Sequence, residues 1–115
     1  LANRRVFVEM NEYPGRPDGA AVDADGCYWT CATDAGALLR FTPQGSLDRA
    51  LRVPVAKPTM CAFGGTDLGD LYVTSLTPAR PVDGYDADVA GALLLLRPGV
   101  RGLPEQAFRP ARTLS

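Results

Sequence analysis

The chain has 115 residues and a mass of 12.2 kDa, enough for one modest domain with a single hydrophobic core. Hydrophobic residues make up 46% and charged residues 22%, as in a soluble globular protein, and the net charge of −1 offers no basic surface for nucleic acid. The longest apolar run, residues 92–96, is far below the roughly 20 residues that a membrane span needs. We therefore expect neither a nucleic-acid partner nor a membrane partner.

Short β-strands are predicted along the whole chain, because apolar and β-branched or aromatic residues alternate with Asp-Gly, Gly-Gly and proline signals. In chain order the predicted strands span residues 5–9, 20–23, 28–32, 37–42, 47–53, 59–64, 71–75 and 92–97. Ten prolines and twelve glycines disfavour long helices. The fold class is therefore predicted to be all-β.

The strands belong to an internal repeat. The tetrapeptide GALL occurs at residues 36–39 and again at 91–94, and the aromatic strand segments WTC and YVT begin at Trp29 and Tyr72. The spacing between equivalent positions is about 41 to 43 residues for the first two strands and about 55 for GALL, so the second copy carries an insertion within residues 76–90. Four strands in roughly 40 to 45 residues are typical of a β-propeller blade.

This repeat predicts a partial β-propeller of about two and a half blades. A propeller closes only with four or more blades, so the remaining blades are expected from the parent chain or from another chain. The first residue is Leu1 rather than methionine, which we interpret as the start of a piece of a longer protein or of a processed product. We expect Cys27, Cys31 and Cys61 to be reduced and buried, which favours a cytoplasmic location.

Asp18 lies between Pro17 and Gly19, directly ahead of a predicted strand. Two interpretations follow from the residues alone: a turn former that bonds its own backbone, or a carboxylate directed at a ligand. In a four-stranded meander, the loop that enters the first strand and the loop between the second and third strands share one face. Asp18 and the insertion at residues 76–90 are therefore predicted to lie together. Four other aspartates are predicted to serve turns and loops only: Asp23, Asp25, Asp67 and Asp70.

Three segments resemble the C-terminal part of the SMP-30/gluconolactonase/regucalcin-like family. They are PDGAAVDADGCYWTC, VPVAKPTMCAFGGTDLGDLYVTS and AGALLLLRPGVRGLP, in the order in which the family has them. The resemblance implies a six-bladed propeller that holds one divalent cation near its central axis. It also implies that the protein hydrolyses lactones, often those of sugar acids. It implies that residues 1–16 are the end of one blade, residues 17–56 one full blade and residues 57–115 most of the last blade.

The resemblance also implies roles for single residues. Asp18 matches the aspartate of the family's PDG motif, which binds the cation together with a glutamate and an asparagine from earlier blades. It is therefore expected to be both metal ligand and catalytic residue, as general base, while the cation polarises the lactone carbonyl. Carboxylate oxygen suits Ca²⁺, Zn²⁺, Mg²⁺ or Mn²⁺. Thr59 and Met60 occupy the place equivalent to Asp18-Gly19 in the next blade, and Tyr85 lies in the insertion, so all three are candidate substrate-binding residues.

The expected function is therefore that of the C-terminal segment of a metal-dependent lactonase, acting on sugar lactones or similar small cyclic esters. The alternative is a non-catalytic propeller module that binds calcium or a small molecule. Because only one of the three protein ligands has a counterpart here, the isolated 115 residues are expected to be inactive. The absence of histidine excludes Cys–His nucleophiles and zinc fingers within this chain.

Overall fold

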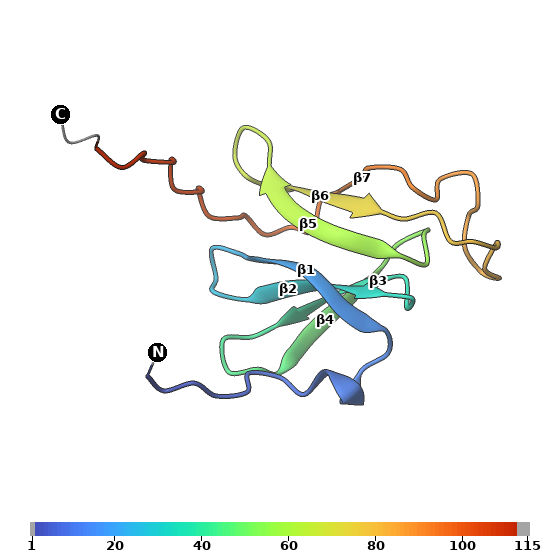
Figure 1. The fold of residues 1–115 in the computed structure, drawn as a ribbon, viewed down its shortest axis with the longest axis horizontal. Helices are drawn as coiled ribbons and strands as arrows, with labels where there is room; N and C mark the ends of the chain where they lie inside the picture. The colour runs from blue at the N-terminus through green and yellow to red at the C-terminus, as the bar shows by residue number, and fades with distance from the viewer. Residues whose placement is uncertain (1, 113–115) are drawn as a thin grey trace.

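The computed structural model describes residues 2–112, which form two antiparallel β-sheets lying side by side (Figure 1). A short 3₁₀ helix, η1, precedes the strands. The elements are η1 Met10–Glu12, β1 Arg16–Val22, β2 Tyr28–Thr33, β3 Ala37–Phe41, β4 Leu47–Arg52, β5 Pro58–Gly64, β6 Asp70–Ser75 and β7 Leu94–Leu96. Among these residues no helix is long and apolar enough to span a membrane. The all-β prediction is confirmed.

Both sheets are meanders. The first has the order β1-β2-β3-β4 and the second the order β5-β6-β7, so each strand pairs with its neighbours in sequence. Tight turns join the strands. Gly26 takes a positive φ of 80° in the β1–β2 turn and Gly45 one of 86° in the β3–β4 turn, a backbone conformation that favours glycine. Each sheet therefore has the strand arrangement expected of a propeller blade, the second with three strands rather than four.

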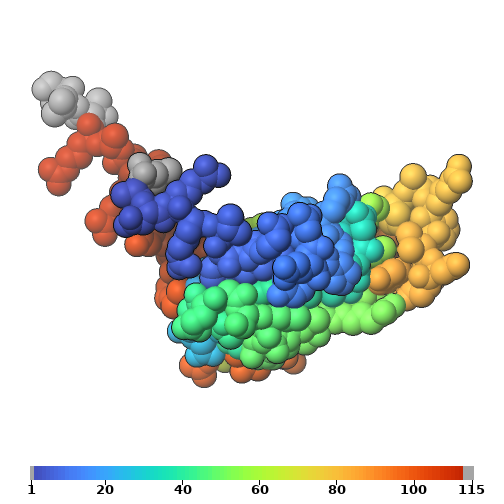
Figure 2. Space-filling model, turned by 90° about the horizontal axis from the view of Figure 1, so that it is seen from below, coloured from blue at the N-terminus to red at the C-terminus, as the bar shows by residue number. Residues whose placement is uncertain are grey.

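The predicted strand at residues 5–9 is wrong. Its alternation of apolar and charged residues fits a strand, but this segment has no β-pairing with any described strand. It lies instead along the side of the first sheet, near the β3–β4 turn (Figure 2). Phe7 packs edge-on against Tyr28 at 5.8 Å between ring centroids, and Val8 packs near Phe41. A strand needs a hydrogen-bonding neighbour, and no described strand pairs with this segment.

Two other predicted strands differ from the observed ones by more than one residue at an end. The first strand begins at Arg16 rather than residue 20, because Arg16 and Pro17 pair with Thr33 and Ala32. The last strand covers only Leu94–Leu96 instead of residues 92–97, because only these three residues pair with β6. The predicted insertion is present as a long segment without strands between β6 and β7.

The main core lies between the two sheets. It is a cluster of buried side chains contributed by both sheets and the linker between them: Trp29, Cys31, Leu38, Val53, Val55, Cys61, Leu71 and Val73. A smaller cluster on the other face of the first sheet contains Ala32, Leu39 and Phe41. Strand β2 is therefore buried on both faces, so its continuous run of small and apolar residues is what its position requires. All three cysteines are free and buried, as predicted.

Asp23 is more than the turn residue that the sequence predicts. Its Oδ1 does accept backbone N–H bonds from Asp25 and Cys27, both at 3.0 Å, which is turn chemistry. Its side chain is also fully buried, and its Oδ2 accepts 2.8 Å bonds from Trp29 Nε1 and Arg40 Nε. Arg40 extends the network to Asp25 at 3.0 Å and to Asp48 at 2.9 Å. This ion network, buried at Asp23 and Arg40 and exposed at Asp25, joins the β1–β2 turn to β3 and β4.

The Asp23 network predicts a stability that depends on pH. Burial by itself would raise the pKa of the Asp23 carboxyl, but its hydrogen bonds, first that from Arg40 and then that from Trp29, hold the pKa below the ordinary 3.8. The stabilisation is therefore complete above about pH 4 and is lost as the pH falls through the lower folded-state pKa. Urea unfolding of the complete protein between about pH 6 and 2.5 should show a loss of stability that is smaller in the variant Asp23→Asn, which keeps only the contributions of other carboxylates such as Asp34 and Asp48. Equal losses in both proteins would contradict this.

Candidate metal and substrate site

One end of the molecule gathers four segments that are far apart in sequence. The start of β1, the β2–β3 turn, the start of β5 and the long loop between β6 and β7 all lie at the right-hand end in Figure 1. Asp34 in the β2–β3 turn bonds Arg16 at the start of β1 and Lys57 just before β5, and Tyr85 in the long loop bonds Ala35. The β1–β2 and β5–β6 turns lie at the opposite end. This is the shared face that the meander topology predicts.

Asp18 lies within strand β1, in a β-bulge, rather than in a turn ahead of the strand. The register of β1 on β2 shifts between the pairs Pro17↔Ala32 and Ala20↔Thr30, so Asp18 and Gly19 form the irregularity. A bulge bends the strand and redirects a side chain, and bulges are frequent next to functional sites. The Asp18 carbonyl accepts a 3.5 Å bond from the Thr30 hydroxyl, which holds the bulge against β2.

The Asp18 carboxylate is exposed and has no hydrogen-bond or ion-pair partner among residues 2–112. The turn interpretation requires the side chain to bond nearby backbone N–H groups, as Asp23 and Asp67 do at 3.0 Å, and Asp18 makes no such bond within the described chain. An unengaged carboxylate suits an oxygen-preferring divalent cation such as Ca²⁺ or Mg²⁺. The same residues contain no cluster of three His, Cys, Asp or Glu side chains, so a cation bound at Asp18 would need further ligands from elsewhere.

The candidate residues Thr59 and Met60 lie beside the Asp18 bulge. A Cβ atom placed on Gly19 would stand 2.5 Å from Cα of Met60 and 2.6 Å from the carbonyl oxygen of Thr59, so only glycine allows β1 and β5 to approach this closely. The Thr59 hydroxyl is 2.8 Å from that of Thr74 on β6, and Met60 is half exposed. The structure therefore brings three of the four predicted site residues together at the junction between the sheets.

Charged groups next to this junction are already paired. The carboxylate of Asp34, which has a positive φ of 76°, accepts bonds from Arg16 Nε at 2.6 Å and Lys57 Nζ at 2.5 Å. The Arg16 hydrogen bond, and after it the Lys57 hydrogen bond, lower the pKa of Asp34. Asp34 thus ties the β2–β3 turn to β1 and to the linker before β5, and it is engaged where Asp18 is free.

Tyr85, the fourth candidate, contacts the first sheet rather than Asp18. Its hydroxyl donates a 3.0 Å bond to the carbonyl of Ala35, and its ring lies on Gly36, where an added Cβ would stand 2.1 Å from Cε1. The guanidinium of Arg52 stacks 5.1 Å from the ring centroid. The sequence carried one signal of this contact: Gly36, the first residue of the GALL repeat, takes a positive φ of 59° and leaves room for the ring.

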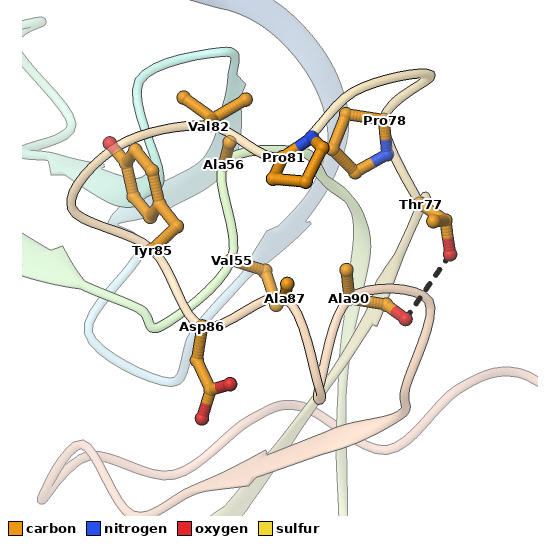
Figure 3. A pocket seen from close by; sticks show the side chains of 10 residues that line it. All are labelled: Val55, Ala56, Thr77, Pro78, Pro81, Val82, Tyr85, Asp86, Ala87 and Ala90. Carbon is orange, nitrogen blue, oxygen red and sulfur yellow. Dashed lines mark hydrogen bonds between the residues drawn. The ribbon is translucent and has the colours of Figure 1, made fainter.

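A small apolar cavity of about 140 Å³ lies beneath the long loop (Figure 3). The loop encloses it against the linker that joins the two sheets. Its lining residues are Val55, Ala56, Thr77, Pro78, Pro81, Val82, Tyr85, Asp86, Ala87 and Ala90. Sequence reasoning did not predict this cavity, because its two walls come from segments more than twenty residues apart.

Comparison with known proteins gives consistent matches. Residues 1–77 match the profile of the family described as the SMP-30/gluconolactonase/LRE-like region. The chain is 42% identical over 95 residues to a 6-deoxy-6-sulfogluconolactonase from Pseudomonas putida, a match that covers 82% of this chain and 33% of that protein. It is 38% identical over 110 residues to a pentonolactonase from Haloferax volcanii, covering 91% of this chain and 38% of that protein.

A solved structure agrees in fold. The crystal structure of regucalcin from Agrobacterium tumefaciens, described as a calcium-binding protein, matches with a TM-score of 0.76 at 29% sequence identity. The match covers 95% of this chain and 38% of the regucalcin chain. The present chain therefore spans between about a third and two fifths of the length of the proteins that it matches.

Proposed function

The chain belongs to the SMP-30/gluconolactonase/LRE-like family, and from that premise we propose that it is the C-terminal part of a metal-dependent lactonase. The observation that carries the proposal is the free, exposed carboxylate of Asp18 in the β-bulge, on the face that also holds the long loop. The substrate proposed is a sugar lactone or a similar small cyclic ester, and two relatives named as lactonases support this class.

In the proposed reaction, water adds to the lactone carbonyl and the ring C–O bond breaks, giving a hydroxy acid. Asp18 has two roles: its carboxylate holds one divalent cation, and it accepts the proton of the attacking water. The cation, when bound, supplies charge stabilisation to the carbonyl oxygen as negative charge develops there. Thr59 and Met60, next to the bulge, would line the substrate side of the site. The substrate ring would also need a shaped wall beside it, which the long loop would supply.

We further propose that the complete protein is a six-bladed propeller in which residues 17–56 form one blade and residues 57–115 most of the last. Residues 1–16 would be the end of the preceding blade. The exposed apolar residues on the outer faces of the two sheets support this arrangement, because the neighbouring blades would cover them. They include Val22 and Tyr28 on the first sheet and Tyr72 and Leu95 on the second, each between 37% and 49% exposed. The other metal ligands would come from the remaining blades, and the isolated segment would be inactive.

A non-catalytic binding module is the second candidate. It is favoured by the structural match to regucalcin, a protein described by its calcium binding. The two candidates differ in turnover and agree in metal binding. A protein that binds the cation tightly and hydrolyses no lactone would fit the second candidate.

The test uses the complete protein that contains this segment. After removal of metal with a chelator, five- and six-membered sugar lactones should be hydrolysed no faster than in buffer. Addition of Ca²⁺, Mg²⁺, Mn²⁺ or Zn²⁺ should restore acid release, measured by a pH indicator. Native mass spectrometry should then find one cation per propeller. Full activity in the metal-free protein would contradict metal dependence, and absence of activity with every cation and lactone would contradict the lactonase assignment.

A further inference from the structure

The long loop between β6 and β7 is fastened to the first sheet at its middle, by Tyr85. We infer that Tyr85 is a positioning residue that fixes this loop as a static wall of the proposed site and thereby limits the size of the substrate. The inference rests on the proposed lactonase function and goes beyond it, since it assigns to one residue of the loop a role in choosing among lactones.

Three consecutive loop residues make the attachment, and each of them contacts the first sheet or the linker that follows β4. Tyr85 donates its hydroxyl to the carbonyl of Ala35 at 3.0 Å. Gly84 accepts a 3.3 Å bond from Arg52 at the end of β4, and the N–H of Asp86 donates a 2.9 Å bond to the carbonyl of Pro54. The attachment therefore crosses from the second sheet to the first, rather than folding the loop onto its own sheet.

Tyr85 is the centre of this attachment because its ring is contacted from two sides. Gly36 lies on one side of the ring, so close that any side chain at position 36 would overlap it, and the Arg52 guanidinium stacks 5.1 Å from the ring centroid. An aromatic ring held against backbone and beneath a cation combines buried area with a cation–π contact. Its hydroxyl also has a fixed partner, the Ala35 carbonyl, so these contacts together favour a single orientation of the Tyr85 ring.

Because a cavity lies beneath the loop, the position of the loop depends mainly on the contacts of residues 84–86 with the first sheet and the linker. In Figure 3 the loop passes around Val55 and Ala56 of the linker. The cavity between the loop and the linker has a volume of about 140 Å³. Atoms that border such a space lose contact partners on one side, so apolar packing holds the middle of the loop weakly. The bases of the loop are tied separately, with Ser75 Oγ donating to the Ala92 carbonyl at 2.6 Å and Thr77 Oγ1 to the Ala90 carbonyl at 3.2 Å. Between the bases, the tie to the first sheet sets where the loop lies.

The anchor point is linked to the strand that carries Asp18. Tyr85 bonds Ala35, and the preceding residue, Asp34, pairs with Arg16 two positions before Asp18. The loop, the β2–β3 turn and the start of β1 are therefore one connected set of contacts at one end of the molecule. A wall held in this way discriminates between substrates by steric fit, whereas a mobile loop would move aside for a bulky one.

The experiment uses the complete protein with the variants Tyr85→Ala and Tyr85→Phe. Hydrogen exchange of residues 76–91 should rise by about tenfold or more in Tyr85→Ala, because ring packing and the hydroxyl bond are both lost. Tyr85→Phe keeps the ring and should show a smaller rise. For activity, kcat/KM is measured for an unsubstituted five-membered lactone and for one with a bulky side chain. The ratio of bulky to small should increase about tenfold in Tyr85→Ala and change little in Tyr85→Phe.

Val82→Ala is the matched control, since Val82 borders the same cavity and makes no hydrogen bond to the first sheet in the described structure. It should leave both the exchange rate and the substrate ratio near those of the parent protein. Unchanged exchange in Tyr85→Ala would overturn the attachment, and increased exchange with an unchanged substrate ratio would overturn the role in specificity. Failure of the lactonase function itself would be seen separately, as absence of hydrolysis in the unmodified protein, while the exchange measurement would still test the attachment.

Discussion

Replacement of Asp18 by asparagine in the complete protein is expected to lower lactone turnover by about 10²–10³-fold and to abolish tight cation binding. The amide keeps the size and shape of the side chain but loses the charge that attracts a divalent cation and the basicity that accepts a proton. Because the Asp18 side chain is exposed and makes no hydrogen bond or ion pair among residues 2–112, the fold should be unaffected. The change in unfolding free energy should stay within about 0.5 kcal/mol.

Two measurements decide this prediction: cation content by native mass spectrometry and steady-state hydrolysis of a sugar lactone. Asp67→Asn is the control, since Asp67 is an exposed carboxylate in the β5–β6 loop at the opposite end of the molecule. It should retain cation and turnover. An Asp18→Asn protein with the cation content and activity of the parent would remove Asp18 from the mechanism.

Replacement of Arg40 by methionine is expected to destabilise the complete protein by about 3–5 kcal/mol, because it leaves the carboxylate of Asp23 buried without its cationic partner. Arg40 also closes the network to Asp25 and Asp48, so its loss separates the β1–β2 turn from β3 and β4. The measurement is urea unfolding at neutral pH followed by the fluorescence of Trp29, the single tryptophan of this segment.

The same substitution at Arg97 is the control. Arg97 pairs with Asp70 at 3.2 Å, but its side chain is 79% exposed, and surface pairs contribute at most about 1 kcal/mol. Combining Arg40→Met with Asp23→Asn should recover part of the lost stability, because the buried charge is then gone. A destabilisation of Arg40→Met no larger than that of Arg97→Met would show that the network contributes little.

The strands of both sheets could be predicted because their signals are local. Asp-Gly and Gly-Gly turns, and Pro58 at the first position of β5, mark where the strands start or stop within a few residues. The same local signals failed at the start of β1, where Pro17-Asp18-Gly19 has the composition of a turn and forms a paired bulge. What decides between the two is the pairing with β2, whose partner residues lie about fifteen positions away. They failed again at residues 5–9, where the alternation fits a strand but no described strand pairs with it.

The location of the candidate site could be predicted from the sequence, but the contacts within it could be predicted only in part. Meander topology and the PDG resemblance located Asp18, and the repeat located Thr59 and Met60 beside it. Tyr85 is a candidate substrate-binding residue by its place in the insertion, and the structure adds contacts of its hydroxyl and ring with Ala35 and Gly36, some fifty residues away. Asp23 likewise carries a turn signal that hides its burial against Arg40. Long-range contacts of this kind leave no periodic pattern in a sequence, so only the folded chain reveals them.

The contact of Gly19 with the backbone of β5 bears on how such proteins can be recombined. Repeat proteins invite the exchange of single units between relatives, on the assumption that each unit brings its own function. Here the carboxylate belongs to the first sheet, while the surface against which its strand rests belongs to the second. A chimera joined in the linker between β4 and β5 would therefore pair a β1 and a β5 that were not selected to fit, and Asp18 would shift with them. Functional hybrids should require both sheets to be transferred together as one cassette.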